Sequence, residues 1–247
     1  MAKPGVALAP VGISRLVGAI KRCASAGADY ASERAPAGSS SGLLSAETSL
    51  KRLKPEQLRP RPYPESMEDP IRLLSSRQIY QGRLVTLRED IVILPKGTET
   101  TYEHVEIKHG SSTLAIADND DVWLVREWKY ALGRPTIEVI SGGMEPDESP
   151  EDTAHRELRE EAGLVAETLI PMGRVDPFTT MLRCANHLFI ARGISQVPHE
   201  REEGEIMECM RVPLTEAVRM VMDGEITHGS SCVLILKAAR WLETARA

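Results

Sequence analysis

Residues 72–108 alternate between apolar and polar side chains in the manner of antiparallel strands. The segments RQIYQGRLVTLREDIVILP and TTYEHVEIKH contain many β-branched residues and are separated by the turn-forming KGTE. Next, STLAIADNDDVWLV has two apolar runs around residues 118–121, and this arrangement predicts a hairpin. Further strands are predicted in TIEVI, ANHLFIARG and EIMECMRVP.

The first predicted helix covers roughly residues 150–162. Ser149 is a suitable N-cap, Pro150 suits the first helical position, and Asp152 completes a capping box. Gly163 is the expected stop, because glycine readily adopts the left-handed conformation that ends many helices.

Two more helices are predicted near the end of the chain, in LTEAVRMVMDG and SSCVLILKAARWLE. The first is expected to open at Thr215 or a neighbour and to close at Gly224. Strands first, a helix between strands and helices at the end predict an α/β or α+β layered domain rather than a doubly wound sheet.

Residues 1–66 differ from the rest: they are rich in Ala, Ser, Pro and Arg, with the linker-like passages APAGSSSG and RPRPYPE. We expect a disordered extension, or a start codon placed too far upstream, before a cytoplasmic domain over residues 67–247. The alternative is a mitochondrial or plastid transit peptide in residues 1–30, where no acidic residue precedes Asp29. An amphipathic helical pattern in this segment is formed by Ile13, Leu16, Val17 and Ile20.

The net charge of −6 and the pI near 5.6 argue against a nucleic acid or an anionic membrane as partner. No run of about 18 apolar residues is present, so no segment is predicted to span a bilayer. The four cysteines lie far apart without a CxxC pair. This favours reduced thiols in an intracellular protein over a disulfide framework or a zinc site.

The segment RELREEAGL at residues 156–164 places three glutamates close together on the predicted helix. At about 100° per residue, Glu157 and Glu161 lie beside the apolar stripe of the helix, and Glu160 lies one step further round. A merely solvated helix would place its acids opposite the apolar face. At least two carboxylates are therefore predicted to be partly buried.

Partly buried carboxylates need a cation, or one of them must take up a proton. Arg156 and Arg159 are expected to project toward the other side of the helix, so we predict a divalent metal such as Mg²⁺ or Mn²⁺. The alternative is a charged surface helix with Glu–Arg pairs four residues apart.

The frame around this helix carries a resemblance to a known family. Gly142 is followed after five residues by Glu148, and after seven more by RELREEAGL. This spacing resembles the Nudix box, G-x5-E-x7-R-E-U-x-E-E-x-G-U with U aliphatic, at every fixed position. The resemblance extends from about residue 72 to the C-terminus. It implies an α/β Nudix fold, with a mixed β-sheet sandwiched between helices and extra N-terminal antiparallel strands.

Nudix enzymes use Mg²⁺ or Mn²⁺ to hydrolyse a nucleoside diphosphate linked to another moiety. The resemblance implies that Glu157 and Glu161 are the principal metal ligands, with Glu160 as a third or water-mediated ligand. The loop of Ser141 and Gly142 would bring a backbone carbonyl to the metal, because glycine allows close approach.

Other members of the implied site lie around these ligands. Arg156 and Glu148 would orient the metal-binding set. The acidic segment HEREEGEIMEC resembles a loop that provides a catalytic base or an extra metal ligand; its alternative role is a solvated loop before a strand. The acids that compete for the functional role are Glu202 and Glu203, as candidate catalytic bases, and Glu205, as a candidate metal ligand.

The passage LVREWKYALGRPTIEVISGG resembles the run before the box in the ADP-ribose and nucleotide-sugar pyrophosphatase branch. Candidates to bind phosphate or ribose are Arg126, Lys129 and Arg134, and Glu138 matches the acid ahead of the glycine loop. Solvated charges on a strand edge are the alternative for each of them. In this branch the N-terminal strands exchange between subunits, so a homodimer is implied.

Two departures from the branch leave the sugar open. Ser141-Gly142 stands in place of P-A-G, and PFTTMLR at residues 177–183 stands in place of S-P-G-x-S. ADP-ribose or an ADP-sugar is favoured, with GDP-mannose, a UDP-sugar or a dinucleotide as alternatives. A non-catalytic nucleotide-binding module is the rival class, but such proteins typically lose box glutamates, and all are present here.

Overall fold

The computed structural model describes residues 69–198 and 207–245, which contain eleven strands, one short 3-10 helix and three α-helices. The first three strands form an antiparallel meander, as predicted from their alternation. A short strand, β9, extends this sheet in the order β1-β2-β3-β9 and runs parallel to β3. The bounds of its members are Arg72–Gln81 for β1, Val85–Ile93 for β2, Glu99–Ile107 for β3 and Leu182–Arg183 for β9.

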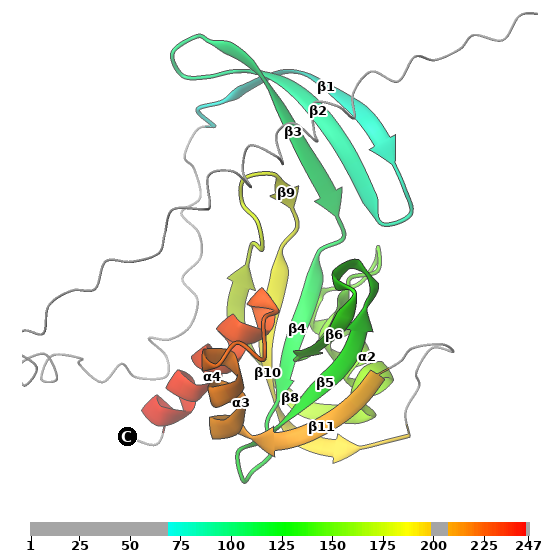
Figure 1. Cartoon of the computed structure of the whole chain (residues 1–247), viewed down its shortest axis with the longest axis vertical. Coiled ribbons are helices and arrows are strands. Elements are labelled where there is room, and N and C mark those ends of the chain that lie inside the picture. Colours follow the sequence, from blue (N-terminus) through cyan, green and yellow to red (C-terminus); the bar gives the residue numbers. More distant parts are fainter. Residues whose placement is uncertain (1–68, 199–206, 246–247) are drawn as a thin grey trace, which may run out of the picture. The chain divides into compact units, whose positions relative to one another are not determined.

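A second, mixed sheet has the order β7-β4-β10-β8. Figure 1 labels three of its strands, β4, β10 and β8. The central pair, β4 and β10, is parallel, whereas β7 and β8 run antiparallel to their neighbours. These strands are β4 at Gly110–Ala115, β7 at Ile140–Gly143, β8 at Leu164–Val175 and β10 at Asn186–Gln196.

A third sheet has the order β11-β5-β6 and is antiparallel throughout. Its strands are Met207–Pro213 for β11, Asp121–Lys129 for β5 and Arg134–Glu138 for β6, and the 3-10 helix η2 at Tyr130–Leu132 joins the last two. The predicted hairpin around residues 118–121 is therefore wrong as a pair of strands. Its two arms share a single bridge between Ile116 and Val122, because both edges of β4 are already bonded to β7 and β10.

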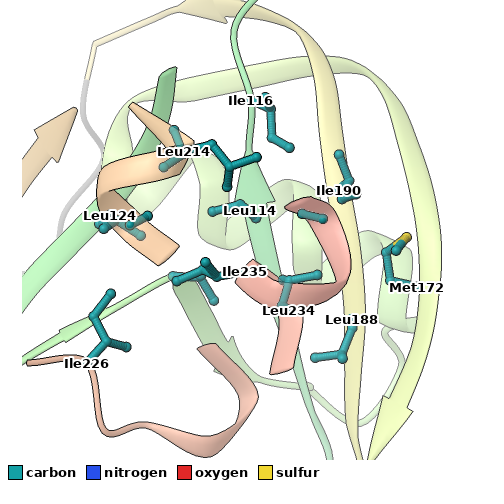
Figure 2. Packing of buried hydrophobic residues seen from close by; sticks show 14 of the residues in the cluster. Leu114, Ile116, Leu124, Met172, Leu188, Ile190, Leu214, Ile226, Leu234 and Ile235 are labelled. Carbon is teal, nitrogen blue, oxygen red and sulfur yellow. The ribbon is translucent and has the colours of Figure 1, made fainter. Parts of the chain in front are cut away.

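Helix α2 at Pro150–Ala162 covers one face of the mixed sheet and α4 at Gly229–Ala245 covers the other, while α3 at Leu214–Met222 packs against α4, β5 and β11. Alternation along β4 decides which face each side chain meets. Ala115 packs with Leu158 of α2, whereas Leu114 packs with Leu234 of α4 on the other face (Figure 2). The two clusters confirm the predicted sheet sandwiched between helices.

The ends of both α2 and α3 agree with the prediction, and Gly224, with a φ of 77°, follows the C-cap of α3. The Ser149 side chain accepts from the Asp152 N–H in a full capping box, and Gly163 ends α2 with a φ of 60°. Helix α3 begins one residue before Thr215, with Pro213 at its N-cap and no side-chain cap. Within residues 69–198 and 207–245, no helix has the length and apolar character needed to cross a membrane.

Candidate active site

The side of α2 that faces the mixed sheet carries two buried glutamates. Glu157 and Glu161 retain only 9% and 8% of their exposure, beside the buried apolar stripe of the helix. Glu160 lies one step further round and is half-buried. The predicted burial of at least two carboxylates is confirmed, and it excludes a merely solvated position for these two side chains.

Strand β7 lies directly against the two buried carboxylates. The Ser141 N–H donates to Glu161 Oε2 at 3.1 Å. A Cβ atom on Gly142 would lie 1.7 Å from Glu157 Oε1, far inside van der Waals contact. Glycine is required here because the Glu157 carboxylate fills the space that a side chain would take.

Arg156 connects the acids of α2 with the loop before the helix. Its guanidinium donates to both oxygens of Glu148, at 2.7 and 2.9 Å, and to the carbonyl oxygen of Gly143 at 2.9 Å. It also donates to Glu157 Oε1 at 2.6 Å and to Glu160 Oε2 at 2.8 Å. The prediction that Arg156 projects away from the acids is wrong. It lies only about 40° around the helix from Glu160, and its long side chain reaches both glutamates.

The acids differ in their protonation because their surroundings differ. Burial, followed by the charge of Glu157, raises the pKa of Glu161 to about 8, although the Ser141 N–H acts in the opposite direction. Burial also raises the pKa of Glu157, against the charge and hydrogen bond of Arg156. By contrast, the hydrogen bonds from Arg156 hold the pKa of Glu148 at about 2. Burial therefore disfavours the charged forms of Glu157 and Glu161, whereas Arg156 stabilises the charged form of Glu148.

A divalent cation could stabilise the charged carboxylates of Glu157 and Glu161. Glu157, Glu160 and Glu161 offer carboxylate oxygens, the donors that hard cations such as Mg²⁺ and Mn²⁺ prefer. Within residues 69–198 and 207–245, no three His, Cys, Asp or Glu side chains already converge as a ligand group. Arg156 instead holds Glu157 and Glu160. The donor set fits a hard cation if these oxygens turn away from the guanidinium.

Strands β5 and β6 contribute a second group of charges near α2. Lys129 donates to Glu127, and its Nζ lies 3.9 Å from Glu138 Oε2. Burial lowers the pKa of Lys129, but the hydrogen bond to Glu127 and the charges of Glu138 and Glu161 outweigh it. The pKa of Lys129 therefore lies above its usual value. Lys129 is therefore a half-buried cation, paired with Glu127 and close to Glu138.

The predicted substrate-binding residues divide between the two faces of this sheet. Lys129 and Arg134 are cross-strand partners, and Arg134 donates to Thr227 Oγ1 at 2.8 Å. Glu138 lies on the same face of β6, four residues after Arg134. Arg126 is exposed on the opposite face of β5, because neighbouring residues of a strand alternate. The structure thus groups Lys129, Arg134 and Glu138 and separates Arg126 from them.

Two family models match this domain. The NUDIX domain matches residues 108–230, and the nucleoside diphosphate sugar hydrolase N-terminal domain matches residues 71–105. The chain is 31% identical over 176 residues to an ADP-ribose pyrophosphatase of Bacillus subtilis, a match that covers 69% of this chain and 92% of that relative. The chain belongs to the Nudix family.

Further similarities agree with this membership. An ADP-ribose pyrophosphatase of Mycobacterium tuberculosis is 31% identical over 166 residues, covering 66% of this Nudix chain and 80% of the relative. A solved structure titled ADP compounds hydrolase matches with a TM-score of 0.64 at 19% identity, over 72% of this chain and 97% of the other. That likeness shows the shared fold. The predicted Nudix fold and hydrolase class are therefore confirmed.

The acidic loop of the Nudix domain was predicted to carry a catalytic base or an extra metal ligand. Its three candidates lie in residues 199–206, outside the part of the chain that the structure describes. They are Glu202, Glu203 and Glu205.

Sequence reasoning missed His228, which lies just before α4. Its Nδ1 is 3.3 Å from Glu138 Oε2 and 2.8 Å from Ser231 Oγ. A histidine in a loop shows no helical or strand period, and its acidic partner is 90 residues earlier in the chain. Only the packing of α4 against the sheets brings the two together, so the sequence pattern held no signal for this contact.

Replacing Arg156 by lysine is expected to weaken Mg²⁺ binding and turnover by about 10- to 100-fold, as for other groups that orient metal ligands. Lysine keeps the charge but cannot donate at once to Glu148, Glu157 and Glu160. Calorimetric Mg²⁺ titration and turnover measure the effect. Arg159→Lys, on the exposed side of the same helix, is the control. Equal Mg²⁺ affinities in the two variants would contradict the role of Arg156.

Proposed function

We propose that this Nudix protein hydrolyses the pyrophosphate bond of a nucleoside diphosphate sugar, giving a nucleoside monophosphate and a sugar phosphate. The observation that carries the proposal is the pair of buried glutamates, Glu157 and Glu161, which lie against Ser141 and Gly142 of β7. ADP-ribose or an ADP-sugar is the favoured substrate. The match of residues 71–105 to a nucleoside diphosphate sugar hydrolase domain supports this choice, as do the names of the two ADP-ribose pyrophosphatases.

Mg²⁺, or Mn²⁺ in its place, is the proposed cofactor. Glu157 and Glu161 hold it, with Glu160 as a further ligand and a backbone carbonyl from Ser141. When bound, such a cation neutralises phosphate oxygens and lowers the pKa of a coordinated water. The burial of Glu157 and Glu161 supports this assignment, because a buried carboxylate pair is stabilised by a cation.

The remaining residues position the ligands and the substrate. Arg156, fixed by Glu148 and the Gly143 carbonyl, sets the direction of Glu157 and Glu160. On the facing strands, Lys129 and Arg134 meet the phosphates or the ribose. Arg126 lies on the other face of β5. It could contact a substrate only from that side, for example a substrate bound by the other subunit of the dimer.

The acidic loop supplies the group that activates or positions the attacking water. Replacing Glu202, Glu203 and Glu205 together by glutamine is expected to lower kcat by about 100-fold or more with little change in KM, since a general base acts in the transition state. The three single variants then identify which acid acts. A triple variant with unchanged kcat would remove the loop from the reaction.

A homodimer formed by exchange of N-terminal strands is part of the proposed function. Strand β1 is exposed along its whole length, including Leu73 at 55%, Ile79 at 43% and Tyr80 at 57%. Large apolar side chains in such a row commonly mark a protein interface. Sedimentation equilibrium should give a mass of two chains, and a single-chain mass at all concentrations would contradict the dimer.

The experiment that tests the proposed function is a turnover screen with Mg²⁺, with products identified by mass. The panel contains ADP-ribose, ADP-glucose, GDP-mannose, UDP-glucose, a dinucleotide and nucleoside triphosphates. We expect the ADP-sugars to be turned over best. Much faster turnover of triphosphates would contradict the substrate class. Binding of the nucleotides without turnover of any of them would indicate a non-catalytic module.

A further inference from the structure

The start of α4 and the residue before it contact the chain where it passes from β6 to β7. Ser231 Oγ accepts from the Val139 N–H at 2.9 Å, and His228 Nδ1 lies 3.3 Å from Glu138 Oε2. The two contacts are made to consecutive residues: Glu138, the last residue of β6, and Val139, which precedes β7. His228 thus supplies one of the contacts that fix the Glu138 side chain.

Glu138 connects His228 with Lys129. The glutamate retains 8% of its exposure, so its oxygens need partners within the protein. Thr136 Oγ1 donates to Oε1 at 2.7 Å, which leaves Oε2 between His228 Nδ1 at 3.3 Å and Lys129 Nζ at 3.9 Å. Without His228, Oε2 would be free to move with the flexible Lys129 side chain.

His228 is itself well fixed. Burial lowers its pKa, against the charge of Glu138, so the imidazole is neutral at neutral pH. His228 Nδ1 shares a hydrogen bond with Ser231 Oγ at 2.8 Å, and the same nitrogen lies 3.3 Å from Glu138 Oε2. The carbonyl of His228 also accepts from the Cys232 N–H at 2.9 Å, within the first turn of α4.

Stability alone does not account for this arrangement. A buried acid with its partners contributes little net stability compared with apolar residues of similar size. The backbone contact between Ser231 and Val139 could anchor the strand without Glu138 or His228. The feature that the polar contacts add is a second carboxylate, 3.9 Å from the Lys129 ammonium group, beside its direct partner Glu127.

We propose that His228 is a positioning residue for the hydrolysis: through Glu138, it holds Lys129 where the pyrophosphate of the substrate binds. This inference rests on the proposed function, because it assigns Lys129 to the phosphates. Lys129 then binds substrate and transition state alike, so its displacement weakens binding more than it slows the chemical step.

The first test measures ADP-ribose hydrolysis by His228→Ala in the full chain with Mg²⁺. KM should rise about tenfold, the effect of losing one hydrogen bond to a charged group, while kcat stays within about twofold. A merely structural role would reduce the folded fraction, which lowers apparent kcat and leaves KM unchanged. His228→Asn should restore KM, because its amide can donate near the position of Nδ1.

The second test is a double-mutant cycle with Lys129→Met. If His228 acts through Lys129, the double variant should have the same KM as Lys129→Met alone. If the KM of the double variant instead rises by the product of the two single fold-changes, the inference is overturned. Cys232→Ala is the control for loosening the start of α4, since Cys232 Sγ donates to the Ile226 carbonyl and lies outside the Glu138 contacts. Its KM should equal that of the wild type.

Failure of this inference is distinguishable from failure of the proposed function. A wild-type protein that turns over no sugar nucleotide contradicts the function. The inference is then tested by calorimetric titration with ADP, with and without Mg²⁺. Binding of ADP should be about tenfold weaker in His228→Ala and normal in His228→Asn. Equal ADP affinity in the wild type and His228→Ala would overturn the positioning role.

Discussion

Replacing Glu161 by glutamine is expected to lower turnover by about a thousandfold or more while leaving the fold intact. The substitution keeps the volume of the side chain and can keep the hydrogen bond from the Ser141 N–H. It removes a hard anionic ligand, and metal ions contribute several kcal/mol to transition states of this kind, at about 1.4 kcal/mol for each tenfold in rate. Turnover of ADP-ribose with saturating Mg²⁺ measures the loss.

The same substitution should stabilise the metal-free protein. Burial raises the pKa of Glu161 to about 8, so at neutral pH the folded chain must take up a proton there or bury a charge. The glutamine amide requires neither. The melting temperature should therefore rise by several degrees, since 1 kcal/mol corresponds to roughly 2–4 °C in a domain of this size. Added Mg²⁺ should stabilise the wild type and not the variant.

Glu151→Gln is the matched control, because Glu151 is exposed on the first turn of the same helix. It should leave turnover and the Mg²⁺-dependent rise in melting temperature unchanged. Wild-type turnover in Glu161→Gln, or equal stabilisation of both variants by Mg²⁺, would contradict the assignment of Glu161 to the metal.

Replacing Gly142 by alanine is the second change with a large expected effect. The new Cβ would lie 1.7 Å from Glu157 Oε1 and 2.0 Å from Glu157 Cδ, so the carboxylate must move. A displacement of about 1 Å at a reacting centre can reduce rate about 100-fold, and we expect a loss of this size in kcat. Overpacking of this kind also lowers the free energy of unfolding by about 1–3 kcal/mol. Turnover and thermal melting measure the two effects.

The neighbouring glycine provides the control. A Cβ on Gly143 would meet only Lys108 Cδ at 3.6 Å and Lys108 Cβ at 3.8 Å, which are ordinary contacts. Gly143→Ala should therefore keep near-normal turnover. If the two alanine variants lost activity equally, the contact between Gly142 and Glu157 would not be what the site requires.

The parts of the fold that local chemistry determines could be predicted. Ser149, Pro150, Asp152 and Gly163 mark the ends of α2, and the structure has the helix at Pro150–Ala162. Strand β8 was missed, because LVAETLIPMGRV lacks regular alternation and contains a proline. Pro171 is tolerated because β8 is an edge strand, and that position depends on the whole sheet.

The site shows the same division between local and tertiary information. The burial of Glu157 and Glu161 follows from helical angles alone. The direction of Arg156 does not, because a long side chain can turn back over the helix to reach its acids. Alternation along β5 separates Arg126 from Lys129, but which of the two faces packs against α2 is a tertiary property.

The central claim is metal-dependent cleavage of a pyrophosphate bond, and hydrolysis of ADP-ribose in ¹⁸O-labelled water tests it most directly. We expect AMP and ribose 5-phosphate, one ¹⁸O atom on a single phosphate group, and no turnover once a chelator removes Mg²⁺. Formation of ADP and free ribose, or undiminished turnover in the presence of the chelator, would contradict the claim.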